Sequence, residues 1–176
     1  MKNVLVIYAH PNYQTSRLNK ALIDEISDLK NVTVSNLYKN YPDGKIDILK
    51  EQELITKNDI IVMQFPFHWY SSPSLMKAWI DEVFSYGFAY GNGSDKLKAK
   101  GFMCVTTSNA SRVRYQNDIG FDFPDLLKPF QNTAKYCSMQ YLAPFILTNE
   151  TKDSTEMSDG DLRLKVQEYK KILESL

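Results

Sequence analysis

Two short segments of the chain are apolar almost throughout, and this pattern constrains the fold more than any other feature. Residues 4–9 read Val-Leu-Val-Ile-Tyr-Ala, and residues 60–65 read Ile-Ile-Val-Met-Gln-Phe. A strand with one solvated face alternates apolar and polar residues, whereas a strand buried on both faces does not. These segments therefore indicate central strands of a parallel sheet that helices cover on both sides.

Other segments supply the remaining strands and the helices. Residues 32–37, 101–107 and 142–147 have the length and composition of strands, and Pro144 in the last of these favours an edge position. Apolar residues recur at helical spacing over 18–29, 75–84 and 162–176. Shorter helices are predicted over 46–57 and 125–139, with Pro129 kinking the second or ending its first part.

The alternation of strands and helices predicts an α/β fold with a doubly wound parallel sheet and helices on both faces. Five strands in this format favour the flavodoxin-like order 2-1-3-4-5. The 176 residues contain no internal repeat or linker, so we expect one domain over residues 1–176. The polar stretch 152–161 is the segment that we expect to be a mobile loop.

Charge and cysteine content exclude several classes of protein. The 21 basic residues balance 21 acidic residues, which argues against a nucleic-acid partner. Cys104 and Cys137 form no Cys-x-x-Cys motif, so neither a zinc ribbon nor a thioredoxin-type motif is predicted, and no metal is expected. No segment approaches the roughly 20 apolar residues that a membrane span needs. We expect a soluble, cytoplasmic protein.

Ligands of open parallel sheets bind outside the carboxyl ends of the strands. This rule selects the loops at residues 10–16, 66–72 and 106–115. The two histidines of the chain, His10 and His68, fall in the first two of these loops. Either one alone could simply bond to the backbone, but the arrival of both at the same edge favours a binding site.

The loop after the first strand leads into a helix and suits a phosphate group. The first turn of a helix has unpaired N–H groups and the positive end of the helix dipole. His10, Ser16 and Asn19 add side-chain donors, and Arg17 could add a charge. Thr15 or Ser16 would also cap an ordinary helix, and the two roles are compatible. The chain lacks the glycine motifs of a Rossmann dinucleotide site and of a P-loop.

The loop over residues 66–73 carries Phe67, Trp69 and Tyr70 at an edge that should face solvent. Exposed aromatic groups in one place indicate a surface that something covers. A planar heterocycle, a neighbouring subunit, or both would explain them.

Several segments together carry a family resemblance: His10-Pro11 with Ser16 and Asn19, the run Pro66-Phe67-His68-Trp69-Tyr70-Ser71-Ser72-Pro73 with the segment 75–84 after it, Phe88-Ala89-Tyr90-Gly91, and Thr106-Thr107. They resemble the flavodoxin-like NAD(P)H:quinone oxidoreductases over essentially the whole chain. Within that family the sequence is most similar to the short ancillary oxidoreductases of glutathione-gated potassium efflux systems and to bacterial general stress proteins.

The resemblance implies a tightly bound flavin, with NAD(P)H as co-substrate and a quinone-like acceptor, in ping-pong order. The short chain favours FMN, while FAD is carried by longer members. The resemblance also implies a homodimer with active sites at the subunit interface. The implied phosphate site is His10, Ser16, Arg17, Leu18 and Asn19; the implied ring site is Pro66, Phe67, His68, Trp69 and Tyr70; the implied pyrimidine-edge site is the backbone of Thr106, Thr107, Ser108 and Asn109.

Two departures from the family pattern bear on the chemistry. Ser108-Asn109 replaces the usual Gly-Gly pair, which lets the backbone approach the flavin closely. Tyr115 is the counterpart of a family tyrosine and the candidate catalytic side chain, but no histidine follows it in the chain. Backbone N–H groups of residues 106–110 are therefore the expected stabilisers of the reduced flavin.

Two rival functions stay open. The chain could be a regulatory subunit that docks on a glutathione-gated potassium efflux transporter, at the inner face of the cell membrane. It could also be a one-electron flavodoxin carrier, although such carriers are usually strongly acidic and this chain is neutral. The sequence leaves the acceptor and the choice between NADH and NADPH open.

Overall fold

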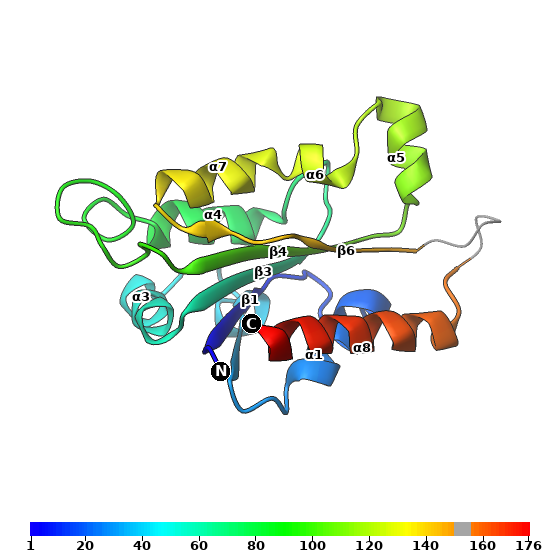
Figure 1. The fold of residues 1–176 in the computed structure, drawn as a ribbon, viewed down its shortest axis with the longest axis horizontal. Helices are drawn as coiled ribbons and strands as arrows, with labels where there is room; N and C mark the ends of the chain where they lie inside the picture. Colours follow the sequence, from blue (N-terminus) through cyan, green and yellow to red (C-terminus); the bar gives the residue numbers. More distant parts are fainter. Residues whose placement is uncertain (150–155) are drawn as a thin grey trace.

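The computed structural model of the chain describes residues 1–149 and 156–176, so residues 152–155 of the predicted loop lie outside the described residues. A parallel sheet lies between two layers of helices (Figure 1). Its strands are β1 (Val4–Tyr8), β2 (Val32–Asn36), β3 (Ile60–Pro66), β4 (Gly101–Ser108), β5 (Gln140–Tyr141) and β6 (Phe145–Thr148). The order β2-β1-β3-β4-β5 confirms the predicted flavodoxin-like arrangement.

The fifth position of the sheet is divided between two short strands. β5 pairs with the start of β4, and β6 pairs with its end. The prediction of one strand over 142–147 is therefore wrong in its bounds. Leu142 still donates its N–H to the carbonyl of Phe102 at 2.8 Å, but Pro144 has no N–H to donate, and it lies in the interruption.

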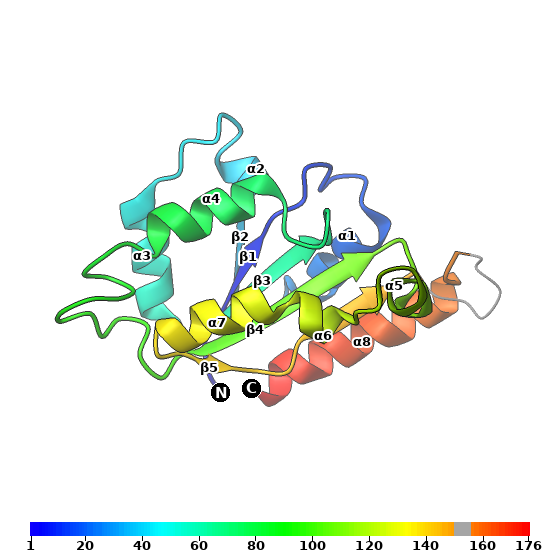
Figure 2. The ribbon, with the colours of Figure 1, turned by 90° about the horizontal axis from the view of Figure 1, so that it is seen from above.

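The helices are α1 (Arg17–Ile26), α2 (Leu37–Asn40), α3 (Ile48–Lys57), α4 (Ser74–Val83), α5 (Arg112–Ile119), α6 (Phe123–Leu126), α7 (Lys128–Tyr136) and α8 (Asp159–Ser175). Helices α1 and α8 pack on one face of the sheet, and α3, α4 and α7 pack on the other (Figures 1 and 2). None of the helices in residues 1–149 and 156–176 is both long and apolar enough to cross a membrane.

The helical predictions need three corrections, the first of which is that the single-turn helix α2 was not anticipated. The helix expected over 125–139 is two helices, and the break at Leu127 precedes Pro129. Pro129 lies in the first turn of α7, where its missing N–H has no partner to lose. Helix α5 was not anticipated because it buries no residue and so leaves no apolar stripe in the sequence.

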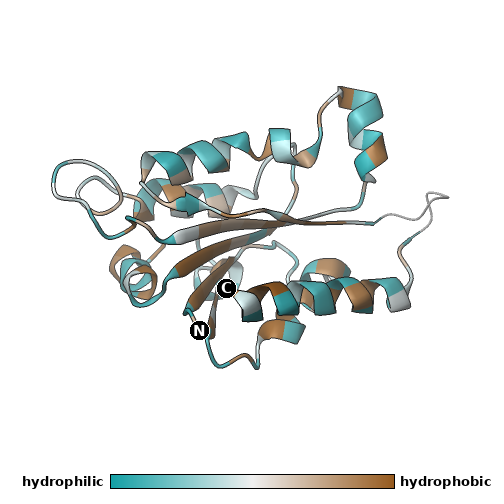
Figure 3. Cartoon of the chain, viewed as in Figure 1, coloured by the Kyte–Doolittle hydropathy of each residue, from teal (hydrophilic) through white to brown (hydrophobic). Residues whose placement is uncertain are grey.

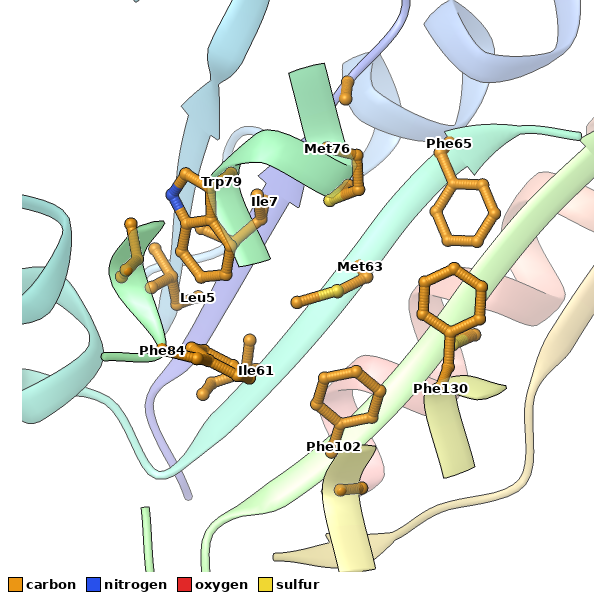
Figure 4. Packing of buried hydrophobic residues seen from close by; sticks show 14 of the residues in the cluster. Leu5, Ile7, Ile61, Met63, Phe65, Met76, Trp79, Phe84, Phe102 and Phe130 are labelled. Atoms are coloured by element: carbon orange, nitrogen blue, oxygen red, sulfur yellow. The ribbon is translucent and has the colours of Figure 1, made fainter. Parts of the chain in front are cut away.

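The side chains of each central strand divide between two cores. On β1, Leu5 and Ile7 join the core under α3, α4 and α7, whereas Val4 and Val6 join the core under α1 and α8. Figure 3 shows β1 and β3 in apolar colours, and Figure 4 shows the first core. In that core Phe65 stacks on Phe130 at 5.2 Å between ring centroids. Burial on both faces is the reason for the unbroken apolar runs.

The parallel strands end at a common edge, toward which the arrowheads of β1, β3 and β4 point in Figure 2. At this edge β2 continues directly into α2, whereas β1, β3, β4 and β6 lead into the loop before α1, the loop before α4, the connection to α5 and the chain after β6. Any ligand that follows the rule for such sheets meets these four segments.

Candidate functional site

A pocket of about 390 Å³ opens at the carboxyl edge of the sheet. We call it the carboxyl-edge pocket. The loop before α1, the first residues of α1, the ends of β3 and β4 and parts of the chain after β6 form its wall. The predicted site residues that line it are His10, Ser16, Arg17, Leu18, Pro66, Phe67, His68, Thr107, Ser108 and Asn109.

Ser16, one of the two N-cap residues that the sequence allows, is the N-cap of α1, but its side chain does not cap the helix. Its backbone is extended and its carbonyl accepts from the N–H of Lys20 at 3.1 Å, while its hydroxyl makes no capping hydrogen bond. A capping serine normally accepts from an N–H one turn further along. The hydroxyl and the first N–H groups of α1 are therefore available to a ligand in the pocket.

Arg17 lies in the wall of the carboxyl-edge pocket and is bound to the chain that precedes α8. Its Nη2 donates to the carbonyl of Met157 at 2.6 Å and to Oδ1 of Asp159 at 2.7 Å. Its Nη1 lies 3.3 Å from Oε1 of Glu156. The positive charge that the sequence suggested at this position is thus already matched by carboxylates.

The two histidines face the same pocket. Nδ1 of His10 accepts from the N–H of Asn12 at 3.0 Å, so in the neutral ring the proton lies on Nε2. Burial, and then the neighbouring His68, lower the pKa of His10. His10 is consequently a neutral hydrogen-bond donor near pH 7.

The aromatic loop is a tight turn with unusual residues at its centre. His68 and Ser71 exchange backbone hydrogen bonds of 2.8 and 2.9 Å across Trp69 and Tyr70, which have φ of 46° and 64°. Two-residue turns with positive φ at both central positions normally use asparagine and glycine, because a bulky side chain is strained there. Trp69, at the centre of this turn, is 92% exposed to solvent.

Trp69, Tyr70 and Tyr115 do not line the carboxyl-edge pocket. They line a second hollow of about 380 Å³ together with Ala110, Arg114, Asp118 and Ile119. We call this hollow the outer pocket. The rings of Phe67 and Tyr115 meet edge to face at 6.0 Å, and Ser108 donates through Oγ to the hydroxyl of Tyr115 at 3.4 Å. These contacts form the partition between the two pockets.

Two of the predicted residues lie in neither pocket. Asn19 is buried behind the wall, where its amide donates to Oγ1 of Thr107 at 2.5 Å and its carbonyl accepts from Nε2 of Gln64 at 3.2 Å. Thr106 is also buried, and its Oγ1 has no hydrogen-bond partner among the described residues. Asn19 therefore supports Thr107 from behind.

The replacement of Gly-Gly by Ser108-Asn109 causes no backbone strain, since neither residue has a positive φ. Oγ of Ser108 accepts from the N–H of Ala110 at 3.1 Å, so that amide is used within the loop. The N–H of Asn109 finds no acceptor within the described parts of the chain. Of these two amides, the one at Asn109 is open to a ligand.

Asn149 and Glu156 also line the carboxyl-edge pocket, and the sequence reasoning missed both. Asn149 follows β6, and its N–H donates to the carbonyl of Ser108 at 2.8 Å. The rule that selects carboxyl ends of strands would have found Asn149 if it had also been applied to the last strand. Glu156 has no such signal, because its place depends on the tertiary path of the chain before α8.

The arrangement defines a class of protein: a doubly wound α/β chain with its ligand pocket at the carboxyl edge of β1, β3 and β4. A family model described as the flavodoxin-like fold matches residues 2–173. The chain belongs to this family, as its sequence predicts.

Individual relatives agree with this assignment. The chain is 44% identical over 146 residues to the glutathione-regulated potassium-efflux system ancillary protein KefF of Enterobacter sp. (strain 638), which covers 82% of each chain. The general stress protein 14 of Treponema denticola in complex with FMN has a TM-score of 0.89, with 34% identity over 98% of both chains. An NADPH-quinone reductase from P. pentosaceus has a TM-score of 0.82, with 26% identity over 97% of this chain and 96% of that one.

Proposed function

We propose that the chain is an FMN-dependent NAD(P)H:quinone-type oxidoreductase. The observation that carries the proposal is the start of α1, where an uncapped Ser16 opens into the same pocket as the ends of β3 and β4. The FMN complex of the general stress protein and the quinone reductase of similar fold support it.

The residues of the carboxyl-edge pocket fit a phosphate-bearing aromatic cofactor. The Ser16 hydroxyl makes no capping bond, and Nη1 of Arg17 is a buried donor without a hydrogen-bond acceptor among the described residues. With the first N–H groups of α1 these donors match a phosphate. Pro66 and Phe67 form an apolar part of the same wall, which suits a flat ring.

Bound FMN would supply the redox chemistry, since flavins accept a hydride from a reduced nicotinamide and pass it to a quinone. The chain supplies position and electrostatics. The N–H of Asn109 and the Nε2–H of His10 would donate to the ring, and Tyr115 would act from the partition between the pockets. We infer that nicotinamide and acceptor bind in turn over the same face of the flavin ring, which gives ping-pong order.

We propose that the active form is a homodimer. Of the three aromatic residues in the loop over 66–73, Phe67 packs into the core and so is not available to a neighbouring subunit. Trp69 stays 92% exposed and Tyr86 67% exposed, and Tyr136 of α7 adds a further exposed ring at 72%. A second copy of the chain would bury this surface.

A second candidate function is a regulatory subunit of a glutathione-gated potassium efflux transporter, which would place the protein in the cytoplasm at the inner face of the membrane. The observation that favours it is the identity of 44% to KefF, which is named as an ancillary protein of such a system. Capture of the transporter by the tagged chain from detergent-solubilised membranes would support this candidate. As a control, an unrelated tagged flavoprotein should not capture the transporter.

Steady-state kinetics test the oxidoreductase. Oxidation of NADPH or NADH by the flavin-loaded protein is followed by absorbance while the concentration of a soluble quinone is varied. Ping-pong order predicts parallel lines in double-reciprocal plots. Absence of quinone-dependent oxidation with a full complement of FMN would contradict the proposal, and intersecting lines would contradict the order.

A further inference from the structure

A carboxylate shares the carboxyl-edge pocket with the start of α1. Among the described residues that line this pocket, Arg17 is the one permanent cation and Glu156 is the one carboxylate. Their charges cancel. The charges of the lining residues therefore sum to zero before the ligand arrives, and Asp159, which also pairs with Arg17, adds a second carboxylate beside the guanidinium. The helix dipole and the hydrogen-bond donors are what attract a phosphate.

The position of Glu156 is set by its neighbours in the chain. Met157 is buried in the core under α1 and α8, and its N–H donates to Oδ1 of Asn149 at 2.6 Å. Ser158 caps α8 by accepting from the N–H of Asp161 at 3.1 Å. The backbone on the C-terminal side of Glu156 is therefore anchored, and the carboxylate is held beside the guanidinium of Arg17.

The two terminal nitrogens of the Arg17 guanidinium, Nη1 and Nη2, make different contacts. Nη2 makes the hydrogen bonds to Met157 and Asp159 that fasten the start of α8 to α1. Nη1 is buried and has no hydrogen-bond acceptor in the described parts of the chain, although Oε1 of Glu156 lies 3.3 Å away. Nη1 is the part of Arg17 that a phosphate oxygen could use.

We infer that Glu156 competes with the phosphate of the bound flavin for Nη1 of Arg17, and so sets how strongly the pocket prefers FMN over riboflavin. The inference rests on the proposed function. A phosphate monoester carries between one and two negative charges near pH 7, and a carboxylate at short range opposes it. Glu156 therefore weakens the phosphate contribution to binding and makes the cofactor easier to exchange.

If Glu156 had a purely structural role, a different effect on FMN binding would be expected. If its carboxylate only helped to fasten α8 to α1, its loss would lower stability and would not strengthen FMN binding. The side chain of Glu156 is 68% exposed, and exposed ion pairs contribute little to stability. The two hydrogen bonds of Arg17 Nη2 already connect α1 to the start of α8.

The test compares two flavins that differ only in the phosphate. The full-length protein, dialysed to remove bound flavin, is titrated with FMN and with riboflavin at low salt, and the Kd of each is obtained from flavin fluorescence. Glu156→Gln should lower the Kd for FMN about threefold and leave the Kd for riboflavin unchanged. Glu168→Gln on α8, which loses the same charge where Glu168 pairs with Lys165 away from the pocket, should change neither Kd.

A double-mutant cycle identifies the mechanism. Arg17→Gln should weaken the binding of FMN and leave the binding of riboflavin unchanged. Adding Glu156→Gln to Arg17→Gln should give no further change in FMN affinity. A full gain in the Arg17→Gln background would overturn competition for Arg17, and an unchanged or weaker FMN affinity in Glu156→Gln would overturn the inference. Binding of neither flavin by the unaltered protein would instead refute the proposed function, and the inference with it.

Discussion

At the scale of single residues, Ser16 could serve as a helix cap or as a phosphate ligand, and the sequence alone could not distinguish these roles. Its hydroxyl makes no capping bond, so Ser16→Ala should leave the free energy of unfolding within about 0.5 kcal/mol of the original value. The same change should weaken FMN binding by about 1–3 kcal/mol, because a phosphate oxygen or its donor loses a partner. Urea unfolding and calorimetric titration measure the two effects. Ser111→Ala is the matched control, since Ser111 caps α5 by accepting from Arg114 and should lose stability instead.

Tyr115 and Asn109 differ in how much they contribute to flavin reduction. A neutral hydrogen bond is worth about 0.5–1.5 kcal/mol, so Tyr115→Phe should slow reduction roughly tenfold. Asn109→Pro removes the open N–H and should cost about 10²–10³ in rate, the value of a fixed donor. Stopped-flow bleaching of the flavin by NADPH and NADH measures both. A thousandfold loss in Tyr115→Phe beside a normal Asn109→Pro would reverse the assignment.

At the scale of elements, a buried carboxylate joins β2, α3 and α4. Glu51 is fully buried and accepts from Oγ of Ser35 at 2.9 Å, the hydroxyl of Tyr41 at 2.8 Å and Nε1 of Trp79 at 3.0 Å. Burial and the bond to Glu51 raise the pKa of Tyr41. The network fixes α4, which follows directly from the strained turn at Trp69, and so it supports the outer pocket from behind.

Glu51→Leu leaves three buried hydrogen-bond donors without an acceptor. Each unsatisfied buried group costs about 1–3 kcal/mol, and some of the three will bind water instead. The free energy of unfolding should therefore fall by about 3–5 kcal/mol. Trp79→Phe loses one donor and some packing, and should cost less. Denaturant unfolding at neutral pH gives both values. Equal stability of Glu51→Leu and the original protein would show that the network contributes nothing net.

At the scale of the whole molecule, the exposed rings of Trp69, Tyr86 and Tyr136 predict a dimer. Stable obligate interfaces usually bury over about 2,000 Å². Sedimentation velocity at micromolar concentration should give the mass of two chains, and Tyr86→Ser with Tyr136→Ser should shift the equilibrium toward one chain. A fully active monomer of the unaltered protein would contradict this expectation.

A feature of this fold or site can be predicted from the sequence only when it produces a local pattern of residues. β1 and β3 were predictable because burial on both faces removes polar residues from them. His10 and His68 were predictable because they lie in the loops that follow these strands. Helix α5 buries nothing and left no pattern. Trp69 was expected against the same ligand as Phe67, but the positive φ values of the turn direct it to the outer pocket. Glu156 reaches the site only through tertiary contacts.

We propose that the carboxyl-edge pocket binds FMN through its phosphate and its ring together. Titration of the full-length protein with FMN, followed by flavin fluorescence, tests it most directly. We predict saturation near one FMN per chain and weaker binding in Ser16→Ala. A protein that binds neither FMN nor FAD at micromolar concentration, while its far-ultraviolet circular dichroism shows a folded α/β chain, would show that this pocket is not a flavin site.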